Sequence, residues 1–214
     1  MAIIQSGSAA GTALLVDPAH GAARVSVRPN DVLSWISVGA ASGSLTGIAG
    51  NAGLFSFRNL SANPIIVRRV GVGFVTTTAF TAAQMVSFGL FAARAFTASD
   101  SGGTAIAFTG ANGKHRTSLG TPTSLDCRIA TTVALGSGTR TLDVTALGVQ
   151  AGWSGAAGTT ISPALNNLMS HDTGDYPIVL AQNEGLVIAN LTAMGAGGAG
   201  IATVAMEFAE ASAF

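Results

Sequence analysis

The sequence predicts an all-β protein, a jelly-roll-like antiparallel β-sandwich that follows an extended N-terminal arm. Apolar residues recur at every second position in several segments, and a period of two is the period of a strand. Clusters of Gly, Ser, Asn and Pro separate these segments, as turns do. Gly and β-branched residues interrupt every Ala-rich stretch, so no amphipathic helix of ordinary length is predicted.

A change in composition near residue 31 predicts a boundary there. Residues 1–31 are rich in Ala, Gly and Ser, with Pro18 and Pro29 as breakers, and we assign them to the extended arm. Residues 32–214 carry the alternating pattern, and we assign them to the β-sandwich domain.

The arm contains two short apolar patches, AIIQ and ALLV, and neither is long enough to make a core. We expect Ile3, Ile4, Leu14 and Leu15 to bind a partner, because ordering an isolated arm costs entropy unless the arm adds to a sheet edge. An adjacent subunit or a capsid is the expected partner. A disordered tail without a role is the alternative.

The first strands of the sandwich are predicted from LFSFRNL, IIVRRVGVGFV and MVSFGLFAARAF. The turn SANP lies between the first two and predicts a hairpin. Ile66 and Val70 are expected to share the inward face of the second strand. By alternation, the inward aromatic residues are Phe55, Phe57, Phe74, Phe88 and Phe208. The outward residues, expected to tolerate change, are Ser56, Arg58, Thr203 and Glu207.

The second half of the chain predicts more hairpins. RIATTVAL and TRTLDVTAL are expected to pair through a GSG turn. The stretch AGWSGAAGTTISPALNNLMSHDTGDYP predicts a long connection, with ALNNLM able to form one helical turn. YPIVL, LVIANL and IATVAMEF are expected to run back and forth through a QNEG turn and a loose GAGGAG tip.

The charge content restricts the partners. Charged residues make up 9% of the 214 residues, and 10 basic side chains balance 10 acidic ones. Ordinary soluble domains carry about 25% charged residues. So neutral a surface attracts neither nucleic acid nor anionic lipid, and a net charge near zero favours association. We expect no nucleic-acid partner, no membrane partner, and contact with further copies of the chain.

Cys127 is the only cysteine, which excludes an internal disulfide. The start of the chain, MAIIQSGSAAG, has neither the basic region nor the long apolar region of a Sec signal peptide. We therefore expect the protein to leave a cell inside a larger particle or by lysis.

None of the short motifs predicts an active site. DTG at 172–174 follows polar residues, unlike the aspartic-protease triplet, and HDTGD is typical of a polar turn rather than a metal site. FTGANGKH lacks the first Gly and the Ser/Thr of a Walker loop. The uncharged stretch 185–206 has acidic flanks and internal glycines, which disfavours a membrane span, and GAGGAG precedes a strand pattern, which disfavours a phosphate loop. We predict a protein that is not an enzyme, with no catalytic, cofactor-binding or metal-binding residues.

Trp153 lies in the Gly/Ala/Ser-rich stretch AGWSGAAG, which predicts a loop. An exposed tryptophan there would anchor a partner or stack on a sugar. The alternative is a ring folded back onto the protein's own core. We include Trp153 among the expected partner-binding residues.

Three stretches, FRNLSANPIIVRRVGVGF, RIATTVALGSGTRTLD and PIVLAQNEGLVIANLTAMGAGGAGIATVAMEFAE, resemble virion structural proteins of tailed bacteriophages. The resemblance covers about half of the chain. It implies a β-sandwich particle protein with no catalytic residues to carry over. The chain lacks the long helix and charged α/β organisation of the usual phage major capsid protein, so the resemblance does not imply a shell-forming role.

The expected function is therefore structural: a decoration or cement protein that binds a phage capsid as a homo-oligomer, specifically a trimer. The expected partners are copies of the chain and the phage major capsid protein or a neighbouring virion protein. The expected location is the virion, assembled in the host cytoplasm, and no cofactor is expected. A tail- or fibre-associated protein is the first alternative. A carbohydrate-binding adhesin that uses Trp153, Tyr176 and the loop acids is the second, and a hydrolase the third.

Overall fold

The computed structural model of the chain describes residues 35–108, 113–118, 120–122, 124–154, 160–171 and 177–211, with backbone alone for 160–166. All of them belong to one unit of the chain, Asp31–Phe214. This described part consists of strands and connections and contains no helix, so the all-β prediction is confirmed. The predicted arm, residues 1–31, lies outside the described residues, and its boundary stays a prediction.

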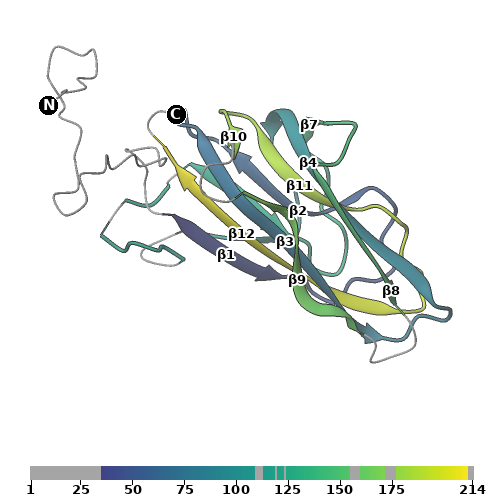
Figure 1. Cartoon of the computed structure of the whole chain (residues 1–214). Coiled ribbons are helices and arrows are strands. Elements are labelled where there is room, and N and C mark those ends of the chain that lie inside the picture. The colour runs from purple at the N-terminus through teal and green to yellow at the C-terminus, as the bar shows by residue number, and fades with distance from the viewer. Residues whose placement is uncertain are drawn as a thin grey trace, which may run out of the picture. The chain divides into compact units, whose positions relative to one another are not determined.

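Five strands form one antiparallel sheet, the five-stranded sheet. It contains, in order, β1 (Ile36–Ala41), β12 (Ala199–Glu210) and β3 (Ile65–Thr78). The other edge of β3 pairs with β10 (Ile178–Leu180) near its start and with β9 (Thr160–Ser170) further along. Figure 1 shows β1, β12 and β3 as long, roughly aligned arrows.

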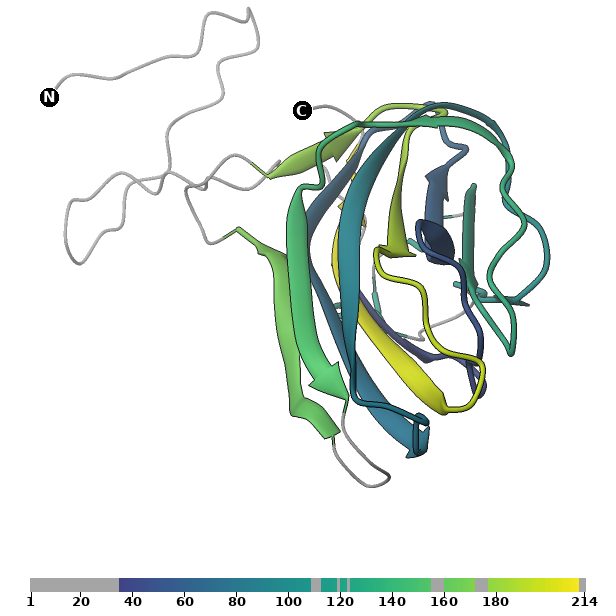
Figure 2. The ribbon, with the colours of Figure 1, turned by 90° about the vertical axis from the view of Figure 1, so that its right-hand side faces the viewer.

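Seven strands form the facing antiparallel sheet, the seven-stranded sheet. Its order is β5 (Thr104–Ala105), β6 (Leu125–Ile129), β2 (Ala52–Asn59), β11 (Gly185–Asn190) and β4 (Gln84–Ala98). The outer edge of β4 pairs with β8 (Gly148–Ser154) near its start and with β7 (Thr139–Leu142) near its end. Figure 2 shows the two sheets as the two sides of a sandwich.

The strand pairs are nested, with early strands pairing with late ones. β1 pairs with β12, β2 with β11, β3 with β10 and β9, and β4 with β8 and β7. At several connections, strands that follow one another in the chain therefore lie in different sheets, as β2 and β3, β10 and β11, and β11 and β12 do. The predicted hairpins through SANP, QNEG and GAGGAG are wrong, because each of these connections crosses from one sheet to the other.

The crossing after β2 is held by Asn59. Its buried side-chain amide donates to Asn63 O at 2.9 Å and to Leu180 O at 3.0 Å, and its Oδ1 accepts from Ser61 N at 2.9 Å. These three bonds satisfy a buried amide and join the SANP turn to β10 in the opposite sheet.

Three further expectations are corrected. The GSG turn does not join a hairpin, because β6 pairs with β2 whereas β7 pairs with β4. ALNNLM lies within β9 and forms strand rather than a helical turn. The GAGGAG tip is packed rather than loose, since a Cβ on Gly198 would overlap the Phe80 ring and one on Gly200 the Phe74 ring.

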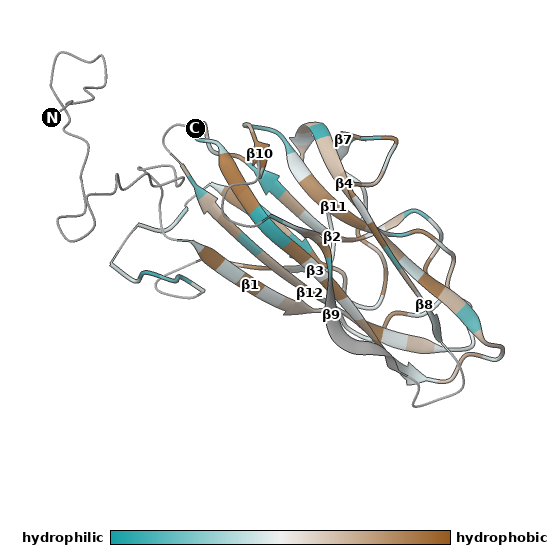
Figure 3. Cartoon of the chain, in the orientation of Figure 1, coloured by the Kyte–Doolittle hydropathy of each residue, from teal (hydrophilic) through white to brown (hydrophobic). Residues whose placement is uncertain are grey.

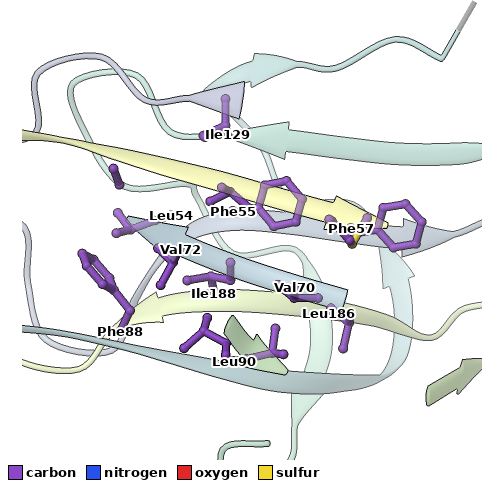
Figure 4. Packing of buried hydrophobic residues seen from close by; sticks show 14 of the residues in the cluster. Leu54, Phe55, Phe57, Val70, Val72, Phe88, Leu90, Ile129, Leu186 and Ile188 are labelled. Carbon is purple, nitrogen blue, oxygen red and sulfur yellow. The ribbon is translucent and has the colours of Figure 1, made fainter. Parts of the chain in front are cut away.

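The core lies between the two sheets, and the predicted inward aromatic residues are confirmed as buried. Phe55, Phe57, Phe74, Phe88 and Phe208 have exposed fractions of 0%, 0%, 2%, 3% and 0%. Rings from opposite sheets meet, with centroids 4.9 Å apart for Phe57 and Phe208 and 5.8 Å apart for Phe74 and Phe88. Figure 4 shows aromatic and aliphatic side chains of both sheets filling this space.

A β-bulge explains why alternation in β3 is broken. The pairing with β12 shifts between Glu207, opposite Arg69, and Phe208, opposite Val67, which leaves Arg68 as an extra residue. Ile65 and Val67 therefore face the core before the bulge, and Val70, Val72 and Phe74 after it. Ile66 is buried but lies on the opposite face of β3 from Ile65 and Val67, so it does not share the inward face with Val70 as predicted. Figure 3 shows a hydrophilic band that interrupts the apolar colour of β3.

Outward-pointing polar residues are more buried than the sequence predicted. Ser56, Arg58 and Glu207 have exposed fractions of 3%, 9% and 7%. Arg58 donates to Ser99 Oγ at 3.0 Å, and its guanidinium carbon lies 5.6 Å from the Phe96 ring centroid. The chain after β4 therefore covers this part of the outer face of the seven-stranded sheet.

Candidate interaction surface

Strand β8 has the opposite pattern to the other core-lining strands, because its large apolar side chains point away from the core. Val149 and Trp153 have exposed fractions of 60% and 71%, and Ala151 between them is exposed as well. Leu147, directly before the strand, is 44% exposed. The other face of β8 carries only Gly148, Gln150, Gly152 and Ser154. In a sandwich, apolar residues ordinarily face inward, so this inversion requires a cause.

The cause is the close approach of the five-stranded sheet at this edge. A Cβ on Gly148 would overlap the carbonyl of Leu168 in β9. Ser154 is fully buried, and its Oγ lies 2.6 Å from Thr76 Oγ1 of β3. Gln150 and Gly152 face Phe74 and Phe88 across a small cavity. Gly148, Gly152 and Ser154 fit this narrow space, and Gln150 lies at the small cavity, which leaves the large apolar residues of β8 on the outer side.

Met85 of β4 extends the apolar row. It lies directly opposite Trp153 in the β4–β8 pairing, and its side chain is 41% exposed. Directly opposed residues in an antiparallel pair contact each other on one face of the sheet. We call Met85, Leu147, Val149, Ala151 and Trp153 together the β8 stripe. A contiguous exposed apolar surface of this kind marks a binding site more often than scattered single residues do.

β8 is also an edge strand. It pairs with β4 on one side, and within the described part of the chain no strand is hydrogen-bonded to its other side. Figure 2 shows β8 and β9 as neighbouring strands where the two sheets meet. An edge with free N–H and C=O groups is a template for pairing with another strand.

The structure corrects the predicted setting of Trp153. The residue lies in β8 rather than in a loop, and a ring that is 71% exposed does not fold onto the core. Met85, Leu147 and Val149 were not predicted from the sequence. The available signal was the alternation in LGVQAGWS, where apolar side chains alternate with Gly and Gln.

The other expected partner-binding residues, Ile3, Ile4, Leu14 and Leu15, lie outside the described residues. Tyr176 and the loop acids Asp172 and Asp175, named for the adhesin alternative, lie outside them as well.

A polar cluster joins β1, β12 and the segment 113–118. Ser37 Oγ lies 2.6 Å from His115 Nε2, and His115 Nδ1 lies 3.9 Å from Glu207 Oε1. The order serine, histidine, carboxylate is that of a hydrolytic triad. However, 3.9 Å is too long for a hydrogen bond, and the same Glu207 oxygen lies 3.3 Å from Arg68 NH1.

Solvent access also argues against a hydrolytic triad in this cluster. Ser37 is exposed and the His115 side chain is 48% exposed, whereas charge development in catalysis is stabilised best where water is excluded. Backbone bonds of 2.8 Å from Ser37 N to Gly113 O and from His115 N to Trp35 O tie the same segments together. We therefore interpret the cluster as an anchor that fastens segment 113–118 to β1.

A buried ion pair lies on the outer face of the seven-stranded sheet. Asp100 and Arg140 contact each other, with side-chain exposures of 0% and 5%. Asp100 Oδ1 accepts from Gly138 N at 2.8 Å, and the Arg140 guanidinium carbon lies 5.3 Å from the Phe96 ring centroid. Burial lowers the pKa of Arg140 below its usual value. The pair holds the chain after β4 against β7, and we assign it a structural role.

Several sequence features have structural explanations. Asn59 and Asn190, the asparagines of two glycosylation sequons, are both fully buried, which is incompatible with a glycan in the folded state. Cys127 is buried, and burial raises the pKa of its thiol.

No group of His, Cys, Asp and Glu among the described residues is arranged to hold a metal ion. The described part also contains no helix long and apolar enough to cross a membrane.

Comparison with known protein families, with characterised proteins and with solved structures finds no match to this chain.

Proposed function

We propose that the protein is a non-enzymatic structural protein that assembles with copies of itself and with neighbouring proteins of a phage particle. The observation that carries this proposal is the β8 stripe. Burying apolar surface contributes about 25 cal/mol per Å² removed from water, and the stripe exposes such surface. Contact with another protein covers the stripe and stabilises an assembly.

The sparse charge of the whole chain supports the same proposal. With 9% charged residues and no net charge, copies of the chain do not repel one another. The described charges are also largely paired with each other. Arg94, for example, lies 2.7 Å from Glu184 and 3.5 Å from Asp143. Its pKa is raised by its hydrogen bond to Glu184 and then by that to Asp143.

We further propose that the sandwich is a jelly roll. The nested pairing of β1 with β12, β2 with β11, β3 with β10 and β4 with β8 is what results when one long hairpin is rolled into two sheets. Jelly rolls occur in viral capsid proteins and in lectins. The architecture therefore supports both a particle protein and, second, a glycan-binding protein.

The proposed place in the particle is the capsid surface, where a trimer of this chain decorates or cements the major capsid protein. This step depends on the resemblance to phage virion proteins. Purified protein added to undecorated capsids of the phage that encodes it should appear as ordered density at one class of symmetry site by cryo-electron microscopy. Ordered density on the tail alone would favour the tail-associated alternative.

The self-association step is tested by removing the apolar character of the stripe. We expect the full chain to be trimeric or larger by light scattering at micromolar concentration, and Trp153→Ser combined with Val149→Ser to shift it to monomer. Val133→Ser is the matched control, because Val133 is 64% exposed but lies outside the stripe. A full chain that is monomeric at this concentration contradicts the proposal.

The exposed Trp153 also favours a second function, in which the ring stacks on a sugar of a host glycan. Binding on a glycan array should then be lost in Trp153→Ala and retained in Trp153→Phe, because an aromatic face is sufficient for stacking. Absence of any glycan signal from the full chain rules this alternative out.

A further inference from the structure

The β8 stripe and the segment of residues 2–16 share their chemistry. The stripe is apolar and uncharged, and its partner must be so as well, because burying an unpaired charge against it costs free energy. The segment 2–16 fulfils this condition: Asp17 is the first charged residue of the chain and Pro18 the first proline. Its large apolar residues are Ile3, Ile4, Leu14, Leu15 and Val16.

The backbone of β8 specifies the form of the partner. One edge of β8 lacks a strand partner within the described residues, and the strand Gly148–Ser154 is 7 residues long. The run ALLV is preceded by AGT, and residues 10–16 together equal β8 in length without a proline to block pairing. In an extended run, Leu14 and Val16 lie on one face, as Val149 and Trp153 do on β8.

We propose that residues 10–16 of a neighbouring copy add to the free edge of β8, with Leu14 and Val16 placed beside Val149 and Trp153. The proposal rests on the proposed function, in which copies of the chain associate. Backbone hydrogen bonds hold the added strand, and the apolar side chains complete the covering of the stripe.

Chain length permits the exchange between copies. Residues 17–34 connect the added strand to the described sandwich, and 18 extended residues span up to about 60 Å. When each copy gives its segment to the next, the contact is heterologous, and it forms a ring when the rotation between successive copies closes. A ring of three matches the expected trimer.

Engineered cysteines test whether residues 10–16 of one copy contact β8 of another. Cys127 is buried and is the only native cysteine, so it does not interfere. Under mild oxidation the full chain with Leu14→Cys and Val149→Cys should give covalent dimers and trimers on non-reducing gels, because Cβ atoms of adjacent strands come within disulfide range. The control pair Leu14→Cys with Val133→Cys should stay monomeric on the gel.

Full-chain variants and a peptide give an independent measurement. Leu14→Ser with Val16→Ser should raise the dissociation constant of the oligomer, as Trp153→Ser does. Combining all three changes should raise this constant no further, because the three side chains belong to one contact. A synthetic peptide of residues 2–16 in excess should dissociate the unmodified oligomer and bind Trp153→Ser poorly.

The failures are distinguishable. If Trp153→Ser dissociates the oligomer while Leu14→Ser with Val16→Ser and the peptide leave it intact, this inference is overturned and the proposed function stands. A cross-link that forms only within one chain overturns the exchange between copies. A full chain that is monomeric and indifferent to Trp153→Ser overturns the proposed function itself.

Discussion

Arg58 illustrates how much the environment of one residue depends on chain that is remote in sequence. Alternation placed it correctly on the outer face of β2, but its guanidinium donates to Thr97 O and Asn183 Oδ1, each at 2.9 Å, and only 9% of the residue is exposed. A buried charged group needs such partners, because water is excluded. Tolerance to substitution therefore follows from what covers a residue and not from the direction of its side chain alone.

Cys127 should be unreactive in the folded protein. Burial raises its pKa, so the thiolate that reacts with alkylating reagents hardly forms even at pH 9, where an exposed cysteine with a pKa of about 8.5 reacts. Because the folded pKa exceeds the unfolded one, this group contributes stability that decreases as the pH rises above about 8.5. Mass spectrometry after iodoacetamide treatment should show labelling in urea only. Rapid labelling without denaturant contradicts the burial.

The ion pair between Asp100 and Arg140 should be costly to break from one side. Asp100→Asn leaves the Arg140 charge buried without a counter-charge, and we expect a loss of about 3–5 kcal/mol in the free energy of unfolding, measured by urea denaturation. Asp100→Leu combined with Arg140→Met removes both charges and should cost less than the single change. A loss below about 1 kcal/mol for Asp100→Asn would show that the pair is solvated.

At the scale of single elements, β4 and β8 differ in which face is apolar. In β4 the residues Val86, Phe88 and Leu90 face the core, as alternation predicted. In β8 the apolar residues face outward, because the approach of Leu168 to Gly148 leaves space only for small side chains inside. Periodicity was present in both strands, but only the packing of β9 decides which face of β8 is covered.

Phe88→Ala and Met85→Ala compare the two faces of β4. Phe88 is 3% exposed and packs on Phe74, so its truncation should cost about 3–5 kcal/mol. Met85 is 41% exposed in the single chain, so in the monomeric Trp153→Ser, Val149→Ser background its truncation should change the free energy of unfolding by about 0.5 kcal/mol or less. Thermal or urea unfolding measures both. Equal effects would mean that the assigned register of β4 is wrong.

At the scale of the whole molecule, the described sandwich is closed by pairing between its first and last strands. The residues of its central cluster run from Ile36 to Phe208, and the first strand pairs with the last, Ile36 opposite Phe208. The closing contact of the sandwich is thus made by residues far apart in the chain, which makes the described fold dependent on long-range pairing.

Because we assign residues 1–31 to an arm outside the sandwich, deletion of residues 2–20 should leave the sandwich folded while weakening self-association. The far-UV circular dichroism spectrum should match that of the full chain, and light scattering should show a smaller species. If the shortened protein does not fold, the segment is part of the core and the boundary at residue 31 is misplaced.

The sequence by itself determined the all-β class, most strands and the inward aromatic residues. These properties follow from side-chain alternation, which is local, so Phe55 and Phe57 could be placed inward from LFSFRNL alone. The position at which the inward alternation of β3 changes could not be predicted, because the bulge at Arg68 is defined only by pairing with β12.

Only the tertiary structure decided which strands pair and where the apolar stripe lies. A turn such as SANP shows that the chain reverses, but a reversing chain can stay in its sheet or cross to the facing one. The choice depends on distant partners, here β11 for β2 and β12 for β3. Likewise, Trp153 is exposed because β9 fills the space behind β8, and no local pattern contains that contact.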